Sequence, residues 1–194
     1  GYFVGINLIL WIFFFLKGEK LSKLRATDRP FLQIIRPAFL VCSISSLFVG
    51  LTYLPIAEAT AIGFVAPLFI TALSVPILKE KVDIHRWIAV IIGLIGVLII
   101  IRPIGDFWHF ASIMPLLGAL FFALFQIMTR LLTVTEKTYT TLFYTGLGGL
   151  LWSSLIVPFV WTFPSQAHIL VFFITGTMGA IAHLFMISAF DRAE

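Results

Sequence analysis

The sequence predicts an all-α membrane protein, a polytopic bundle of seven transmembrane helices. Of its 194 residues, 60% are hydrophobic and only 11% are charged, whereas soluble globular domains have about 45–50% and 25%. Apolar runs recur along the whole chain, and they lack the alternation of apolar and polar residues that marks the strands of a membrane barrel. This composition excludes both a water-soluble fold and a disordered chain.

Seven apolar runs follow one another with polar connections between them. Most have the roughly 17–25 residues that a helix needs to cross a bilayer; the first starts with the chain and the fourth is short. No connection is rich enough in Gly, Ser or Pro to separate domains, so the spans are expected to form one bundle. The predicted spans are residues 1–16, 37–54, 57–78, 85–101, 110–129, 139–161 and 168–190.

The positive charges orient this bundle in the membrane. All 13 Lys and Arg residues except Arg102 fall in the loop 17–36 or in later segments on the same side. Cytoplasmic loops carry an excess of Lys and Arg, so these segments are predicted to face the cytoplasm. The charges form no stripe along one face, which argues against a nucleic-acid partner. The expected partners are the lipid bilayer and a small-molecule substrate, and a homodimer is left open.

A short internal repeat suggests two related halves. The pair Ala57-Glu58 recurs as Ala193-Glu194, 136 residues later. Because this offset contains five helices, an odd number, the two halves would be inverted relative to each other in the membrane. Inverted repeats are typical of secondary transporters.

Several segments resemble the EamA-type transporters of the drug/metabolite transporter superfamily. YLPIAEATAIGFVAPLF at 53–69, LKEK at 78–81 and RWIAVIIGLIGVLIIIRP at 86–103 are similar to the first repeat of that family. AFDRAE at 189–194 is similar to the matching junction of the second repeat. The chain departs from the family at Lys79, where a Gly is usual, and at Pro37, where a Gly is common.

This resemblance implies a ten-helix fold of two inverted five-helix repeats in the cell (inner or plasma) membrane. Helices two to five of the first repeat would lie in residues 1–104, and helices six to eight of the second in residues 105–194. The expected function is secondary transport of small metabolites by alternating access, with no cofactor and no metal.

A polar stripe on the span 57–78 is the first candidate substrate site. Its residues are spaced as one face of a helix. Pro67 cannot donate a backbone hydrogen bond and clashes with the carbonyl of Gly63, and freed backbone groups near the midplane mark substrate or ion sites in carriers. Close packing of helices is the alternative. The stripe comprises Thr60, Gly63, Pro67, Thr71 and Ser74, and Phe64 beside it is included in the site.

Two ionisable residues are further candidates. His183 lies within the last span, with Gly176 and Gly179 on the same face, so it is predicted to point toward packed helices and to bind substrate. The alternative is a histidine that only bonds a neighbouring helix. Glu58 is a candidate for gating or ion coupling, although a carboxylate in a first helical turn also stabilises the helix dipole.

The resemblance also implies that the third and sixth helices of the family line a central cavity. Ser43, Ser46, Gly50 and Tyr53 fall on the former, and Pro115, Phe122, Gln126 and Thr129 on the latter. Of these, Ser46, Tyr53 and Gln126 are predicted to bind substrate. Gln126 has an alternative role as a hydrogen-bonded bridge between helices.

An enzymatic function has little support in the sequence. The chain contains no phosphate-binding loop, no H-E-x-x-H and no G-x-S-x-G motif, and no catalytic residue is assigned. The alternatives to a carrier are a membrane-embedded enzyme that uses His183 as a base with Asp191, and a structural membrane subunit. The eight-residue separation of His183 and Asp191, about 12 Å along a helix, disfavours the enzyme.

Overall fold

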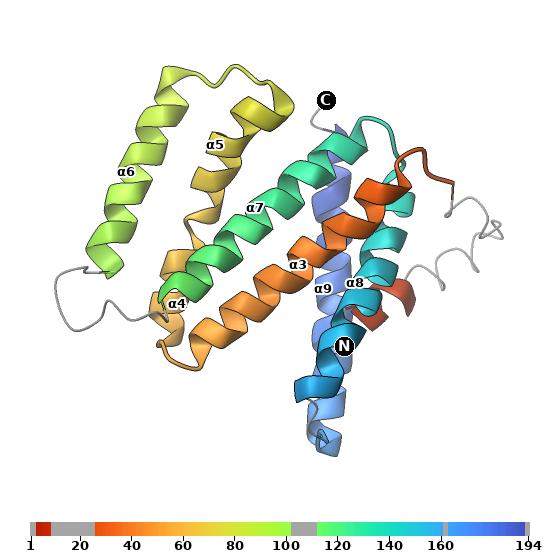
Figure 1. The fold of residues 1–194 in the computed structure, drawn as a ribbon. Helices are drawn as coiled ribbons and strands as arrows, with labels where there is room; N and C mark the ends of the chain where they lie inside the picture. The colour runs from red at the N-terminus through yellow and green to blue at the C-terminus, as the bar shows by residue number, and fades with distance from the viewer. Residues whose placement is uncertain (1–2, 9–25, 102–111, 161–162, 193–194) are drawn as a thin grey trace. The chain divides into compact units, whose positions relative to one another are not determined.

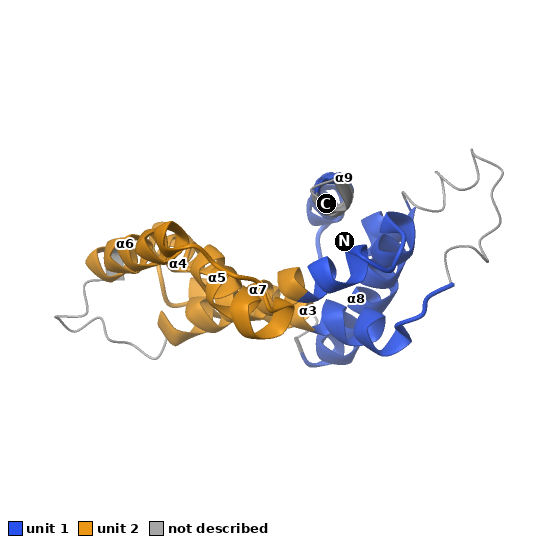
Figure 2. Cartoon of the chain, turned by 90° about the horizontal axis from the view of Figure 1, so that it is seen from above, with its two compact units in different colours: residues 1–38, 128–194 blue, residues 39–127 orange. Residues whose placement is uncertain are grey.

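A computed structural model describes residues 3–8, 26–101, 112–160 and 163–192, and for some residues of the helices only the backbone. These parts of the chain are helical and contain no strand. They divide into two compact units, residues 1–38 with 128–194 and residues 39–127, coloured blue and orange in Figure 2. Helices α3 (Pro30–Leu51) and α7 (Ile113–Thr133) each contribute to both units.

The unit of residues 39–127 carries the centre of the predicted first repeat. It contains α4 (Ile56–Gly63), α5 (Ala66–Leu78) and α6 (Ile84–Ile101), and α6 packs against both α4 and α5 (Figure 1). Among its described residues, buried apolar side chains form two clusters. One comprises Leu54, Ala59 and Ile62, and the other Val65, Ala66, Val97 and Ala119.

The other unit combines the beginning of α3 and the end of α7 with α8 (Thr138–Val160) and α9 (Gln166–Arg192), which pack against each other. The helical segment 3–8 lies against both. A Cβ atom on Gly5 would lie 2.5 Å from the backbone of Gly176 in α9, and one on Gly149 in α8 would lie 2.2 Å from the Phe3 ring. Glycine at these positions allows the helical backbones to approach closely.

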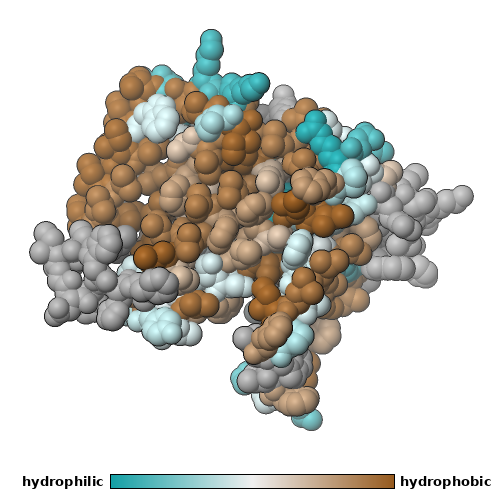
Figure 3. Space-filling model, viewed as in Figure 1, coloured by the Kyte–Doolittle hydropathy of each residue, from teal (hydrophilic) through white to brown (hydrophobic). Residues whose placement is uncertain are grey.

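Four helical stretches are long and apolar enough to cross a membrane: Pro30–Leu51, Ile56–Leu78, Ile113–Thr133 and Thr138–Phe159. Ile84–Ile99 and Gln166–Gly179 are shorter apolar helices. Apolar side chains cover much of the visible surface in Figure 3, and in α6 the exposed residues include Ile88, Ile91, Ile92, Ile95 and Ile99. The chain is therefore a helical membrane protein. The number of seven spans stays a prediction, because the span 1–16 lies largely outside the described residues.

Helix α3 begins at Pro30, before the apolar run that was predicted to start at residue 37. A proline is well tolerated in a first helical turn. The carboxylate of Glu136 accepts hydrogen bonds at the start of this helix from the Thr27 hydroxyl (2.7 Å) and from the Asp28 and Arg29 amides (2.8 and 3.3 Å). A distant residue thus stabilises the first turn, and an apolar run cannot show this.

Candidate functional site

The span 57–78 is broken at the position predicted from Pro67. Helix α4 ends at Gly63 and α5 begins at Ala66, one residue before the proline. At the break the Val65 amide donates to the carbonyl of Ile62 (3.0 Å) and the Leu68 amide to that of Val65 (2.9 Å). These bonds have the three-residue spacing of a 3₁₀ turn. Pro67 has no amide hydrogen to donate to the Gly63 carbonyl.

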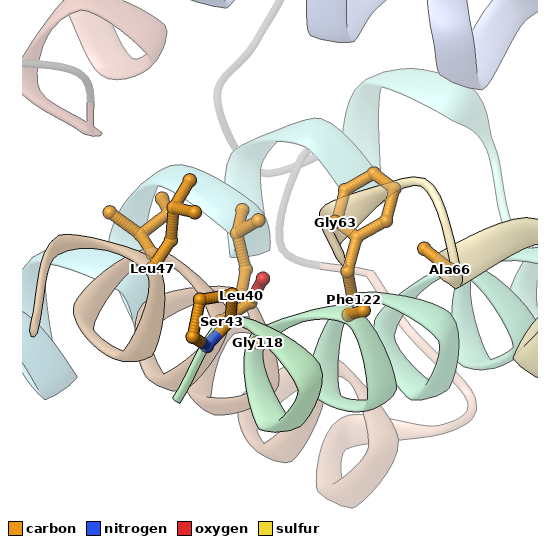
Figure 4. A pocket seen from close by; sticks show the side chains of 10 residues that line it. Leu40, Ser43, Leu47, Gly63, Ala66, Gly118 and Phe122 are labelled. Atoms are coloured by element: carbon orange, nitrogen blue, oxygen red, sulfur yellow. The ribbon is translucent and has the colours of Figure 1, made fainter. Parts of the chain in front are cut away.

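A pocket of about 270 Å³ lies beside this break, within the unit of residues 39–127 (Figure 4). Three helical stretches form it: α3, the α4–α5 break and α7. Its lining is apolar except for the hydroxyl of Ser43. The lining residues are Leu40, Ser43, Ile44, Leu47, Gly63, Ala66, Pro115, Gly118, Ala119 and Phe122.

Small residues allow α3 and α7 to meet along this pocket. A Cβ atom on Gly118 would lie 3.1 Å from the Ser43 carbonyl oxygen, so a side chain there would press on the α3 backbone. Gly63 has the opposite surroundings, because a Cβ atom added to it would meet no atom within 4 Å. The pocket is therefore tight where the two long helices cross and open at Gly63.

Four residues that the sequence placed on three different spans are brought together here: Ser43, Gly63, Pro115 and Phe122. The predicted polar stripe does not stay on one buried face. Ser74 is buried, but Thr60 and Pro67 are exposed and Phe64 is 76% exposed. The 3₁₀ bonding at the break shifts the helical phase between α4 and α5, because a 3.6-residue period does not continue through a turn with three residues per turn.

The hydroxyls of the stripe bond within their own helices. Thr60 donates to the carbonyl of Ile56 (2.7 Å), and Thr71 donates to that of Pro67 (3.0 Å). Such bonds satisfy the hydroxyl locally. Neither hydroxyl therefore forms an interhelical hydrogen bond to another described residue. The role of Thr60 and Thr71 as substrate contacts stays a prediction.

The other predicted residues lie around this region. Ser46 is half-buried in α3 beside Gly118, while Tyr53 follows α3 and is 73% exposed. Glu58 is half-buried in the first turn of α4. The side-chain oxygen of Gln126 is buried, with no hydrogen-bond partner in the described structure, so the predicted bridge through that atom is not found there.

His183 belongs to α9, but its side chain lies outside the described residues. Its helix face can be located through Gly176, one of the two glycines on which the prediction rested. Gly176 is buried and lies against Gly5 of the segment 3–8. That face of α9 is thus packed against another helix seven residues before His183.

Arg36 is the functional candidate that sequence reasoning missed. The charge pattern predicts that it belongs to the loop 17–36, yet it lies inside α3 and is fully buried. Its guanidinium donates to the Thr129 hydroxyl (2.9 Å), the Thr141 carbonyl (2.8 Å) and the Thr145 hydroxyl. One signal for this cluster was present in the sequence: Thr141 and Thr145 are spaced one helical turn apart within an apolar span.

Comparison with known proteins identifies the family. The sequence profile of the EamA-like transporter family matches residues 2–102. The chain is 28% identical over 188 residues to an S-adenosylmethionine uptake transporter of Rickettsia felis, covering 97% of this chain and 63% of the relative.

It is also 29% identical to a riboflavin transporter of Brucella anthropi, over 84% of this chain and 60% of the relative. A riboflavin transporter of Vibrio cholerae is 30% identical, over 84% of this chain and 55% of the relative. The chain thus spans less than two thirds of the length of these curated relatives, and no solved structure matches it.

The family and the apolar helices together describe a multi-pass integral membrane protein of the cell membrane. The chain belongs to the EamA-like transporter family of the drug/metabolite transporter superfamily.

Proposed function

We propose that the protein is a secondary carrier that moves a small metabolite across the cell membrane by alternating access of two inverted repeats. The observation that carries this proposal is the broken α4–α5 helix beside the pocket, in a chain of a transporter family. Broken helices near the midplane supply backbone groups and room for substrate in many carriers.

The chemistry of the pocket suggests which part of a substrate it holds. Its lining is apolar, it contains the aromatic ring of Phe122, and Ser43 offers one hydroxyl. Such surroundings suit a flat ring better than a charged group, because an unpaired charge in an apolar site is costly. S-adenosylmethionine and riboflavin, which the names of the relatives mention, each contain a planar nitrogen heterocycle. We propose that the pocket takes a ring of this kind.

Uptake into proteoliposomes tests the carrier. The full-length protein should give saturable accumulation of radiolabelled riboflavin or S-adenosylmethionine, above protein-free liposomes, and the label should be recovered chemically unchanged. A converted product would favour the enzyme that uses His183. The proposed substrate class would be contradicted if the protein bound neither compound and gave no counterflow of either.

A pair of glycine variants tests the pocket itself. Gly63→Leu fills the open space beside the break and should raise the half-saturation concentration at least about tenfold, which corresponds to about 1.4 kcal/mol of lost binding free energy. Gly96→Leu is the matched control, because Gly96 also has no atom within 4 Å of its added Cβ but does not line the pocket. Equal effects of the two variants would show that the pocket does not bind the substrate.

A further inference from the structure

The buried guanidinium of Arg36 joins three helices. Arg36 itself belongs to α3, Thr129 to the last turns of α7, and Thr141 and Thr145 to the first turns of α8. The Thr145 hydroxyl donates its own hydrogen to the Thr141 carbonyl (2.7 Å), so its oxygen lone pairs are oriented to accept from Arg36. All four residues are at most 2% exposed.

A second polar contact joins the same segments. Glu136 lies in the turn between α7 and α8 and accepts hydrogen bonds from the Thr27 hydroxyl and the Asp28 amide, which immediately precede α3. Its side chain is 8% exposed. We name the two contacts together the inner clasp: Arg36 with Thr129, Thr141 and Thr145, and Glu136 with Thr27.

Stability alone gives a weak reason for such a cluster. Burying a guanidinium loses hydration, and apolar side chains of similar volume often stabilise a protein as well or better. Hydrogen bonds to a charged group can, however, be broken reversibly, because water can replace every partner when the contact opens. An open pocket of about 520 Å³, whose lining includes Thr27, Glu136, Lys137 and Thr140, borders the clasp and can supply that water.

We propose that the inner clasp is a gate, which closes the cytoplasmic side in this state and releases when the carrier opens inward. The inference rests on the proposed function, in which α3 belongs to the first repeat and α7 and α8 to the second. The clasp ties the two repeats together at the end that the positive charges place in the cytoplasm. Relative motion of the repeats must therefore break it.

Cysteine labelling tests the gate independently of transport. Thr140 borders the clasp and is 2% exposed. In the full-length protein, Thr140→Cys with Cys42→Ser should react slowly with a membrane-impermeant maleimide added from the cytoplasmic side. Adding Thr145→Val, which removes the hydroxyl acceptor of Arg36 but keeps the shape, should accelerate labelling at least about fivefold.

Two control variants separate gating from helix damage. Thr145→Ser keeps the hydroxyl and should label at the parent rate. Thr175→Val should also label at that rate, because the Thr175 hydroxyl bonds the carbonyl of Val171 at 2.7 Å as Thr145 bonds Thr141, but it is exposed and binds no Arg36. Glu136→Gln weakens the second contact and should accelerate labelling as Thr145→Val does. It replaces Thr145→Val as the test if Thr145→Val is not recovered folded.

Transport gives the second readout. If the protein carries riboflavin or S-adenosylmethionine, addition of that compound should change the labelling rate of Thr140→Cys. The Thr145→Val variant should alter the maximal uptake rate more than the half-saturation concentration. Parent-like labelling of both Thr145→Val and Glu136→Gln, or the same acceleration by Thr175→Val, would overturn the gate. Absence of uptake with intact labelling differences would instead contradict the proposed function.

Discussion

Gly50 of α3 and Pro115 of α7 meet so closely that a Cβ atom on the glycine would lie 2.6 Å from the proline Cγ. A proline ring cannot move away by rotating a flexible side chain, so any side chain at residue 50 has to displace a helix. This contact fixes the distance between two of the helices that line the pocket.

Gly50→Ala is therefore expected to lower the free energy of unfolding by about 1–3 kcal/mol, the usual cost of overpacking. Gly96→Ala is the control, because the added Cβ meets no atom within 4 Å and alanine favours a helix interior over glycine by roughly 0.5–1 kcal/mol. Thermal unfolding of the full-length protein in detergent compares the two. A stable Gly50→Ala protein would mean that α3 and α7 separate more easily than this contact implies.

Lys79 ends α5 in the left-handed conformation, with φ 56° and ψ 31°. In the described chain it is the one non-glycine residue with positive φ, and the resemblance to the family implies a glycine at this position. Left-handed backbone costs a side-chain-bearing residue roughly 1–2 kcal/mol. Lys79→Gly should raise the free energy of unfolding by about 1 kcal/mol.

Lys81→Gly serves as the control for Lys79→Gly, since it removes the same charge from the same turn without a positive φ. It should give no gain in the same thermal unfolding assay. A gain of equal size in both variants would assign the effect to charge and not to backbone conformation.

The sequence predicts the helix break from Pro67, because proline lacks an amide hydrogen in any surroundings. Proline alone does not decide the outcome, since Pro37 and Pro76 lie inside α3 and α5 without ending these helices. The pocket was predictable only in part, since the resemblance to the family implied a cavity lined by the helices that carry Ser43, Pro115 and Phe122. The exposed positions of Thr60 and Phe64 were not predictable, because the 3₁₀ bonds at the break depend on how the two short helices pack.

Arg36 shows a different limit of the sequence. A positive charge just before an apolar run usually stays in the cytoplasmic loop, and this rule assigned it there. Its actual position depends on acceptors from Thr129 and Thr145, which lie about a hundred residues further along the chain. A single sequence does not show that these distant residues lie close to Arg36.

Topology is testable at two turns of the described chain. Tyr53 between α3 and α4 is 73% exposed, and Lys81 between α5 and α6 is exposed as well. The distribution of Lys and Arg predicts that residue 81 faces the cytoplasm and residue 53 the opposite side. Single cysteines at the two positions, in a Cys42→Ser background, should react with impermeant reagents from opposite sides. Reaction from the same side would contradict the predicted orientation.

Pro67→Ala tests whether the break matters for transport. Alanine restores an amide that can donate to the Gly63 carbonyl, so α4 and α5 should join into one helix and the thermal stability should rise. Uptake should fall at least about tenfold, because a continuous helix changes the wall of the pocket. Pro76→Ala is the matched control, since this proline lies inside α5 and does not line the pocket. Unchanged uptake by Pro67→Ala would make the proline a packing element only.

His183→Leu addresses the face of α9 on which Gly176 lies. Gly176 on that face lies against Gly5, and His183 follows it by seven residues, which is two helical turns and the same side. An ionisable side chain within a span costs about 2.5 kcal/mol or more to insert, so its removal should leave membrane insertion intact or improve it. If the imidazole binds substrate, uptake should nevertheless fall at least about tenfold.

His168→Leu provides the control, because His168 is exposed in the first turn of the same helix. Normal uptake by His183→Leu, with insertion equal to that of His168→Leu, would assign His183 to helix packing and remove it from the substrate site.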